Sequence, residues 1–494
     1  MKTIHYPLCL ILLILSCSPP EKAMDVPTDG PIQLHPENPH YFLYKGKSRA
    51  LITSAEHYGA VLNLDFDYKN YLRTLASDGM NYTRIFGGSY FEIYGESFGI
   101  QKNTLAPKPG RVATPWKVST ADDGHSIYDL TQWNAAYFTR LKKFMTVANE
   151  NDVIVEVTLF SSIYNDRHWD INPQNAKNNT NLTDSINYQS AHTTDNGELI
   201  KFQEMYVRKM VSELNDFDNF FFEIQNEPWA DNQVSVLNLL NNVDQAEKSW
   251  KYEAHFAQQR ALDWQEWIAS FIQDEESRLE KKHLIAQNYV NYMAPIPNVS
   301  DRISIVNFHY AWPNAVNWNY HYDKVIGFDE SGFAGSGDDI YRLQAWQFIM
   351  SGGSLFNNLD YSYFSGSEDG LGENKAPGGG GAALRMQLKV LSEFIHGFAL
   401  EKLKPANSMV VSSSGLIPYV LANSSDEFAI FLHAVGTKSS TLALKADVGS
   451  YEVTFLNVKS GQYSESKMIS AENGIITVPV DIPDGELAIR ILKK

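Results

Sequence analysis

Two glutamates that follow strand-like runs could together break a glycosidic bond. Glu227 follows the apolar run 220–226 and stands before Pro228, and Glu330 ends a second short run, 325–330. Both runs are typical of buried strands, and a proline ends such a strand because it cannot donate to the ladder. A pair of carboxyl groups across a cleft hydrolyses glycosides: one protonates the leaving oxygen and the other attacks the sugar or activates water. The chemistry that these residues indicate is therefore acid-base chemistry on a sugar.

The elements that must position the two glutamates alternate between strands and amphipathic helices from about residue 40 to residue 400. This alternation predicts a parallel α/β architecture, and eight strands are the number that closes a (β/α)8 barrel. A doubly wound open sheet is the alternative, but the glycine-rich phosphate fingerprint of that fold is absent after the first strand. The predicted strands are 49–55, 82–87, 153–161, 220–226, 283–289, 303–309, 325–330 and 354–361.

The motif Asn226-Glu227-Pro228 after the fourth strand, with Glu330 at the end of the seventh, resembles the signature of the retaining glycoside hydrolases of clan A. The resemblance implies that Glu227 is the acid/base, that Glu330 is the nucleophile and that Asn226 hydrogen-bonds the sugar 2-hydroxyl. It covers residues 32–400. The alternative is a chance tripeptide at the end of a strand. A looser likeness links the chain to bacterial cellulase-like and apiosidase-like proteins of polysaccharide degradation.

His309 and Tyr310 end the sixth predicted strand. In clan A a histidine and a tyrosine at this point respectively line the sugar site and hydrogen-bond the nucleophile, so the resemblance extends to both residues. The alternative is a histidine with its hydrogen bonds satisfied at the barrel mouth and a tyrosine that only packs, since aromatic rings are common in cores.

Arg84 ends the second strand and resembles the clan arginine that keeps the nucleophile ionised. A cation beside Glu330 would lower the pKa of that carboxyl, while burial without a cation would raise the pKa of Glu227. The mechanism needs this difference in pKa between the nucleophile and the acid/base. The alternative role of Arg84 is a salt bridge to Glu223, which points inward too and lies deeper along its strand.

Other side chains near strand ends could contact sugar hydroxyls or stack on sugar rings. His57 stands at the end of the first strand and Asp360 at the end of the eighth, while Trp229 and Trp312 offer flat surfaces for pyranoses. Clan A often has a tryptophan after the eighth strand, whereas this sequence has Asp360-Tyr361-Ser362-Tyr363 there, so the resemblance does not extend to that stacking platform. The loops 89–131 and 162–194 are long and are predicted to form the walls of a cleft. The glycine-containing segment 365–381 is either a loop over the site or a plain connection.

Composition sets limits on the partners. The net charge of −17 argues against nucleic acid and anionic lipid surfaces, because both require clustered lysine and arginine. The histidines are scattered and the aspartates are not clustered, so no metal site and no cofactor are predicted. The expected partner is a carbohydrate substrate.

The N-terminus predicts export. Lys2 precedes an apolar run, 8–15, that is too short to span a membrane, and Cys17 follows in a position that resembles a bacterial lipobox. Residues 1–17 would then be a lipoprotein signal, an acylated Cys17 would hold the chain on the cell envelope, and 18–31 would be the linker. The alternative is an ordinary signal peptide with an incidental cysteine. Cys9 lies in the removed segment, so the mature chain forms no intrachain disulfide.

After residue 400 the helical pattern stops, and short alternating runs recur to the C-terminus. This pattern predicts a small antiparallel β-sandwich over 401–494, after a barrel with its lead-in hairpin over 32–400.

The resulting functional hypothesis is a lipid-anchored, retaining β-glycoside hydrolase acting on a polysaccharide or its oligosaccharides. One rival is a surface glycan-binding lipoprotein without turnover, since a fold alone does not specify activity. The other is a transglycosylase that uses the same residues and passes the sugar to another hydroxyl. The sequence selects no sugar, linkage, mode of cleavage or oligomeric state.

Overall fold

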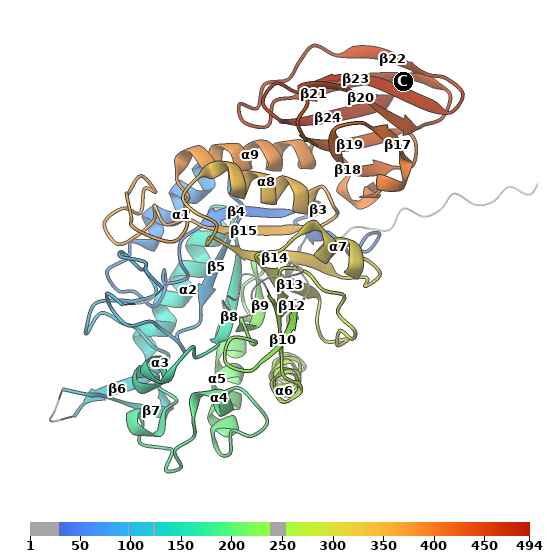
Figure 1. Cartoon of the computed structure of the whole chain (residues 1–494). Coiled ribbons are helices and arrows are strands. Elements are labelled where there is room, and N and C mark those ends of the chain that lie inside the picture. Colours follow the sequence, from blue (N-terminus) through green and yellow to red (C-terminus); the bar gives the residue numbers. More distant parts are fainter. Residues whose placement is uncertain (1–28, 97, 122–123, 238–252) are drawn as a thin grey trace, which may run out of the picture.

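The computed structural model describes residues 29–96, 98–121, 124–237 and 253–494 (Figure 1). The predicted signal, Cys17 and most of the 18–31 linker lie outside the described residues. Among the described residues, no helix is long and apolar enough to cross a membrane.

Eight parallel strands form a barrel, which confirms the predicted fold class and each of the eight predicted strands. In spatial order the path is β4-β15-β14-β13-β12-β9-β8-β5. The first and second strands, β4 and β5, meet without a regular ladder. Instead the side-chain carboxamide of Asn81 accepts from Ile52 N at 2.9 Å and donates to Ala50 O at 2.8 Å. The strands are β4 Leu51–Ala55, β5 Tyr82–Phe86, β8 Ile154–Ser161, β9 Phe220–Asn226, β12 Ile285–Asn291, β13 Ile305–His309, β14 Val325–Ser331 and β15 Leu355–Leu359.

Helices cover the outside of the barrel because each buries one apolar stripe against the strands. In α2 (Ala135–Glu150) the stripe of Phe138, Leu141 and Met145 is buried, and Asn134 caps the helix by accepting from two backbone N–H groups. The main helices are α1 Tyr68–Ser77, α2 Ala135–Glu150, α5 Leu199–Leu214, α6 Gln259–Glu276, α7 Pro313–Asn319, α8 Asp338–Ile349 and α9 Ala382–His396.

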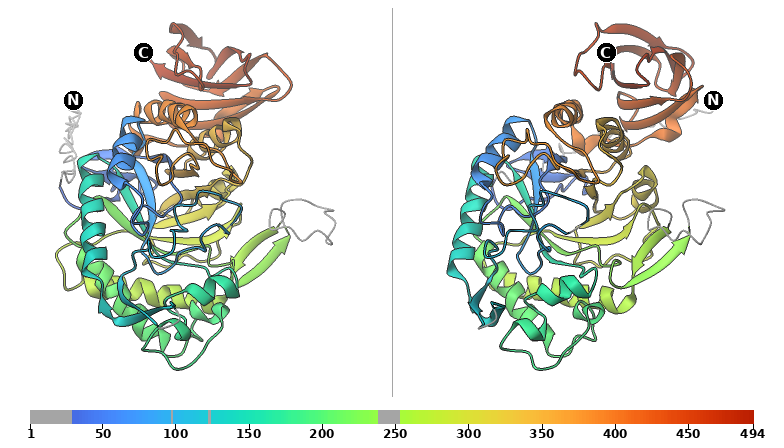
Figure 2. Two further views of the ribbon diagram at one scale, coloured as in Figure 1. Left: turned by 90° about the vertical axis from the view of Figure 1, so that its left-hand side faces the viewer. Right: turned by 60° about the vertical axis from the view of Figure 1, so that its left-hand side comes forward.

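Insertions gather at the carboxyl ends of the strands. The loop after β5 carries the hairpin β6 Trp116–Thr120 and β7 Ser126–Trp133, and the loop after β8 carries α3 Asp166–Ile171, η1 Ala176–Asn178 and α4 Tyr188–Ala191. After β9 a second hairpin, β10 Gln233–Leu237 and β11 Glu253–Ala257, pairs with the edge of β12. Figure 2 shows that hairpin projecting from the side of the barrel.

The opposite end of the barrel is closed by apolar side chains. The lead-in strands β1 Gln33–Leu34, β2 Phe42–Tyr44 and β3 Lys47–Arg49 form a small sheet there. Ile32, Phe42 and Tyr44 pack against the first residues of the barrel strands, such as Tyr82 and Phe221. Because this end is plugged, only the end with the long loops can admit a ligand.

The C-terminal region is an antiparallel sandwich with its own core, as predicted. One sheet has the order β16-β18-β19-β24-β21-β22 and the other β17-β20-β23. The sandwich lies against α8 and α9 (Figure 1). Its elements are η3 Leu400–Lys402, β16 Lys404–Pro405, η4 Asn407–Met409, β17 Val410–Ser413, β18 Leu416–Asn423, β19 Glu427–Ala434, β20 Ser439–Lys445, β21 Gly449–Leu456, β22 Lys467–Ala471, β23 Ile475–Asp481 and β24 Glu486–Lys493.

Candidate active site

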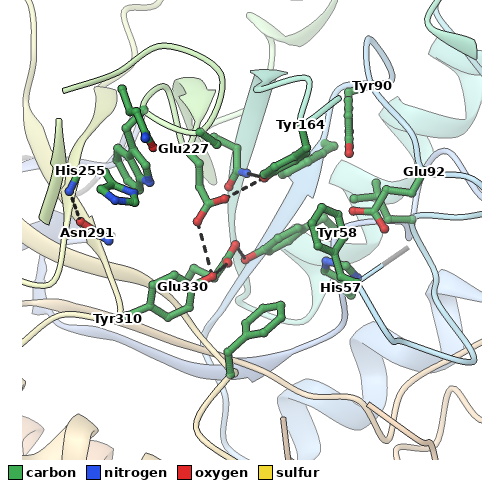
Figure 3. A pocket seen from close by; sticks show the side chains of 18 residues that line it. His57, Tyr58, Tyr90, Glu92, Tyr164, Glu227, His255, Asn291, Tyr310 and Glu330 are labelled. Atoms are coloured by element: carbon green, nitrogen blue, oxygen red, sulfur yellow. Dashed lines mark hydrogen bonds between the residues drawn. The ribbon is translucent and has the colours of Figure 1, made fainter. Parts of the chain in front are cut away.

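Glu227 and Glu330 face each other at the open end of the barrel (Figure 3). A carboxylate oxygen of each lies within 4.8 Å of the other and of a ring nitrogen of His309. Tyr310 joins them, because its hydroxyl lies 2.6 Å from Glu330 Oε1 and 3.4 Å from Glu227 Oε1. The two strand ends that the sequence singled out therefore do bring their carboxyl groups together.

Glu227 is held from both sides. His309 Nδ1 lies 3.0 Å from its Oε1, and the Tyr164 hydroxyl donates to its Oε2 at 2.9 Å. The same tyrosine oxygen accepts from Asn226 Nδ2 at 2.9 Å. The backbone of Glu227 is left-handed, with φ of 48°, and its N–H donates to Asn288 Oδ1 at 3.1 Å.

Three tyrosines that follow barrel strands share this left-handed backbone. They are Tyr58 after β4, Tyr292 after β12 and Tyr310 after β13, with φ between 53° and 60°. Such a conformation costs about 1–3 kcal/mol at a non-glycine residue and persists where the surroundings fix it. Two of the three, Tyr58 and Tyr310, aim their hydroxyls at the same carboxylate.

That carboxylate is Glu330. Tyr58 donates to its Oε2 at 2.7 Å, Tyr310 donates to its Oε1 at 2.6 Å, and Arg84 Nη1 lies 3.5 Å from Oε2. Burial raises the pKa of both tyrosines well above the ordinary value, so both remain donors. Each carboxylate oxygen of Glu330 thus has one fixed hydroxyl donor.

Arg84 fills the polar interior below the site. Its guanidinium lies 2.5 Å from Glu223 Oε2, 3.6 Å from Asp329 Oδ2 and 3.9 Å from Glu156 Oε2, and all four side chains are fully buried. It also donates to Asn226 Oδ1 at 2.9 Å. Arg84 therefore makes both contacts considered from the sequence, because it pairs with Glu223 and also reaches Glu330.

The pKa split of the two glutamates runs opposite to the one expected from sequence. Burial raises the pKa of Glu330, and the charge of Glu227 adds to it, although His309 and Arg84 oppose the change. Burial acts the same way on Glu227, but the hydrogen bond and charge of His309, together with the Tyr164 hydrogen bond and the charge of Arg84, outweigh burial and lower the pKa. The expectation was wrong because it left out a buried imidazole in direct contact with Glu227.

Two groups of side chains have the spacing of metal ligands: Glu227, His309 and Glu330 at the mouth, and Glu156, Glu223 and Asp329 below it. In the lower group the Arg84 guanidinium already supplies positive charge among the carboxylates. In the upper group the His309 ring nitrogen that could bind a metal is engaged with Glu227.

Above the two glutamates lies a cavity of about 260 Å³. Two of the residues predicted from sequence, Arg84 and His309, do not line the cavity. They contact residues that do. The predicted residues on the cavity wall are His57, Asn226, Glu227, Trp229, Tyr310 and Glu330.

Two predicted residues lie elsewhere. Asp360 is fully buried, where Arg385 Nη1 donates to it at 2.6 Å and Ser54 at 3.0 Å, so its carboxylate is used to hold β15 and α9 together. Trp312 directly precedes α7 and is 53% exposed, outside the cavity lining. Asp360 is therefore not placed to contact a sugar bound over the two glutamates.

The cavity also contains residues that sequence reasoning missed. Tyr58 directly follows His57 at a strand end, so the same search for polar side chains near strand ends could have identified it. Glu92 and Tyr164 come from the long loops, where no periodic pattern indicates which side chains turn inward. His255 and Asn291 line the far side, and His255 N donates to Asn291 Oδ1 at 2.6 Å (Figure 3).

No protein-family model matches the sequence, and no curated protein matches it. Solved structures do match over most of the chain. A candidate glycoside hydrolase from Bacteroides vulgatus is 12% identical, with a TM-score of 0.65 over 94% of this chain and 82% of that one. A glycoside hydrolase family 5 structure from the same species is 9% identical, with a TM-score of 0.59 and 94% of each chain covered. A third structure, described as a glycoside hydrolase, is 11% identical, with a TM-score of 0.59 over 94% of this chain and 97% of that one. At such identities the likeness shows a shared fold.

Proposed function

We propose that this protein is a retaining β-glycoside hydrolase. The observation that carries the proposal is the contact of Tyr310 with both glutamates, whose nearest oxygens lie within 4.8 Å of each other. Retaining enzymes hold their carboxyl groups about 5–5.5 Å apart, whereas inverting enzymes need about 6.5–9.5 Å to admit a water. The short separation favours direct attack by a carboxylate. The fold shared with solved glycoside hydrolases supports the same class of reaction.

Glu330 is the proposed nucleophile. One of its oxygens attacks the anomeric carbon as the bond to the leaving oxygen breaks, and Glu227 gives its proton to that oxygen. Water then attacks the resulting glycosyl ester, Glu227 takes one of its protons, and the Glu330 carboxylate leaves. Tyr58 and Tyr310 fix the direction of the attacking carboxylate, and Arg84 stabilises its charge.

The acid proton belongs to the pair formed by His309 and Glu227. The pKa of His309 is raised well above its ordinary value: burial opposes this, but the charges of Glu330 and Asp329 outweigh burial. With Nδ1 and Oε1 3.0 Å apart, the proton can reside on the imidazole or on Glu227. A lowered pKa of Glu227 at rest is thus compatible with its role as the acid, because the neighbouring imidazolium can return the proton as negative charge develops on the leaving oxygen.

The test uses the soluble form without residues 1–17, assayed on aryl β-glycosides and β-linked oligosaccharides. Glu330→Gln is expected to abolish turnover, and Glu227→Gln to lower it by about 10²–10⁴-fold. Glu150→Gln, at an exposed position on α2, is the matched control and is expected to turn over like the parent. Full activity of Glu227→Gln and Glu330→Gln would refute the proposal.

Azide assigns the two roles. In Glu330→Ala, azide can replace the nucleophile and would give the α-glycosyl azide after one inversion. In Glu227→Ala, azide can attack the glycosyl ester and would give the β-glycosyl azide after two. The reverse pattern would exchange the roles. Assays with acceptor sugars separate hydrolysis from transglycosylation, and binding without turnover by the parent across the panel would favour a glycan-binding protein.

The proposed location is the cell envelope, with an acylated Cys17 as the anchor and a carbohydrate as the partner. The support is the apolar run 8–15 followed by Cys17. Full-length protein is expected in the membrane fraction, and Cys17→Ser in the soluble fraction of the exported pool. Membrane association that survives Cys17→Ser would exclude this anchor.

A further inference from the structure

The wall of the cavity is continuous on one side of the glutamates. The loop after β5 meets the segment that follows β15 across the end of β4. Gln101 N donates to Lys375 O at 2.9 Å, Lys102 N donates to Asn374 Oδ1 at 3.0 Å, and Asn374 Nδ2 donates back to Lys102 O at 3.0 Å. The segment 365–381, for which the sequence left two roles open, therefore closes this part of the barrel mouth.

The same loop after β5 is joined to the loop after β8. The rings of Phe98 and Tyr164 meet edge to face, 4.8 Å between centroids, and Asn172 Nδ2 donates to Ser89 O at 3.2 Å. Together the three loops surround the half of the mouth above β15, β4, β5 and β8. Figure 2 shows the blue loops lying across the open end of the barrel.

Polar side chains stand at the closed end of the cavity. Glu92 and His57 both line it, and Asn103 connects them: its Nδ2 donates to Glu92 Oε2 at 2.5 Å, and its Oδ1 lies 3.0 Å from His57 Nδ1. In Figure 3 Glu92 and His57 lie on one side of the two glutamates, and His255 and Asn291 lie on the other. The side chain of Glu92 is thus fixed with its carboxylate at the closed end.

The other half of the mouth is less enclosed. It is bordered by the hairpin β10–β11, which contributes Gln233 and His255 to the lining and projects away from the barrel (Figure 2). Gln233 is exposed. A sugar chain bound over the glutamates can leave the site in this direction, whereas the joined loops block it on the other side.

The size of the cavity agrees with this asymmetry. Its 260 Å³ is slightly below the ~300–1,000 Å³ typical of sites for drug-sized ligands, which suits about one sugar ring at the closed end. Carboxylates bind neutral sugars by accepting from hydroxyl groups, and those hydrogen bonds are stronger than neutral ones. Glu92 can do so beside His57, whose pKa burial lowers to about 4, leaving the imidazole neutral at neutral pH.

We infer, on the basis of the proposed function, that the enzyme removes a single neutral sugar from the non-reducing end of its substrate and that Glu92 binds the hydroxyls of that sugar. The joined loops admit one ring at the closed end, and the remaining chain extends past the β10–β11 hairpin. A uronic acid is disfavoured there, because Glu92, Glu227 and Glu330 are all carboxylates on the cavity wall.

Product analysis tests the mode of cleavage. On a β-linked oligosaccharide labelled at its reducing end, the parent enzyme is expected to release unlabelled monosaccharide from the first time point and to shorten the labelled chain by one unit at a time. At early times, labelled fragments shortened by several units at once, or labelled monosaccharide released while the chain is still long, would overturn the inference while leaving the glycosidase intact. Absence of hydrolysis on the whole panel would instead refute the proposed function.

Deoxy substrates test Glu92. An aryl β-glycoside and its analogues lacking one hydroxyl each are assayed with the parent, Glu92→Gln, Glu92→Asp and the control Glu150→Gln. The parent and control are expected to discriminate against one or two analogues, and Glu92→Gln to lose about 10- to 100-fold in kcat/KM on the full substrate but little on those same analogues. Equal losses on every substrate would show that Glu92 only supports the loop. If Glu92→Gln does not fold, the same comparison with Glu92→Asp decides.

Discussion

The imidazole of His309 contacts Glu227 through a 3.0 Å separation between Nδ1 and Oε1, while its Nε2 lies 3.5 Å from Asp329 Oδ1. The ring therefore lies between a carboxylate of the active site and a carboxylate of the barrel interior. Burial alone would favour the neutral ring. The combined effect of the two carboxylates, with that of Glu330, raises its pKa and makes His309 a store for the acid proton.

This arrangement has a consequence for the pH dependence of kcat/KM. The reaction needs an ionised Glu330, whose raised pKa places the acid limb above the ordinary value of 4.5, and a proton on the His309–Glu227 pair, whose loss places the basic limb above 6.5. In His309→Gln the proton must reside on Glu227 alone, so the basic limb is expected to move to lower pH. The acid limb is expected to move to higher pH, because His309 no longer lowers the pKa of Glu330.

The measurement is kcat/KM against pH for the parent and His309→Gln on an aryl β-glycoside whose leaving group needs protonation. A substrate with a leaving group that departs without a proton serves as the control, and its basic limb is expected to be much less sensitive to the substitution. A basic limb that stays in place in His309→Gln would show that Glu227 holds the proton without the imidazole.

Arg84 supports both the site and the fold. Its removal would leave Glu223, Asp329 and Glu156 buried without their shared cation, which typically costs about 3–5 kcal/mol. Arg84→Leu is expected to lower the unfolding free energy by that amount at neutral pH and by less at acidic pH, where protons replace the lost charge. Denaturant unfolding at both pH values measures it. Arg111→Leu, which breaks an exposed pair with Asp65, is the control and is expected to cost under about 1 kcal/mol.

Features that arise from residues close together in the chain could be predicted from the sequence, whereas features that arise from contacts between distant segments could not. Alternating strands and helices are local patterns, so all eight barrel strands could be predicted. The pair Glu227 and Glu330 could be placed because both lie at strand ends, which a barrel brings to one face. Glu92 and Tyr164 turn inward only because loops far apart in sequence pack on one another. No periodic pattern in the sequence indicates this packing.

The electrostatic effects of the buried charged side chains were even harder to predict from the sequence. The side chains of Arg84 and His309 each contact carboxylates from several strands, so their effect depends on distances that no single segment specifies. Asp360 illustrates the same point, because its partner Arg385 lies on α9 and removes it from the site.

Glu56 gives a pH-dependent contribution to stability that can be isolated. It is fully buried at the end of β4, where its carboxyl accepts from Gly59 N and Ala60 N, and burial raises its pKa to about 7. The folded state then holds a proton that the unfolded chain releases near its ordinary value, 4.5. The stability from Glu56 is therefore fully present below about pH 4.5 and is lost as the pH rises to about 7, by about 3 kcal/mol in all.

Glu56→Gln cannot ionise, so the difference in unfolding free energy between the parent and this variant isolates the effect. Relative to Glu56→Gln, the parent is expected to be more stable at pH 4.5 than at pH 7.5. Other buried groups titrate equally in both proteins and cancel. A difference that does not change with pH would mean that Glu56 is ionised throughout, with its charge stabilised by the two backbone N–H groups.

The barrel and the sandwich are expected to unfold together. Arg342 on α8 is fully buried and makes two hydrogen bonds to Glu486 on β24, at 2.9 and 2.7 Å, and Trp346 stacks on Phe431 of β19 with 5.3 Å between centroids. Residues of both units belong to one continuous apolar cluster. Calorimetry of the full chain is expected to show one cooperative transition.

Glu486→Ala probes this docking directly. It leaves Arg342 buried with fewer acceptors, which is expected to cost about 2–3 kcal/mol because hydrogen bonds to charged groups are the stronger ones. The melting temperature of the single transition should fall, whereas Asp426→Ala, at a surface position of the same sandwich, should leave it unchanged. Two separate transitions in the parent, with only the sandwich transition moved by Glu486→Ala, would show instead that the barrel is stable on its own. The sandwich would then be dispensable for the fold of the site, and a chain ending at residue 400 should keep its activity.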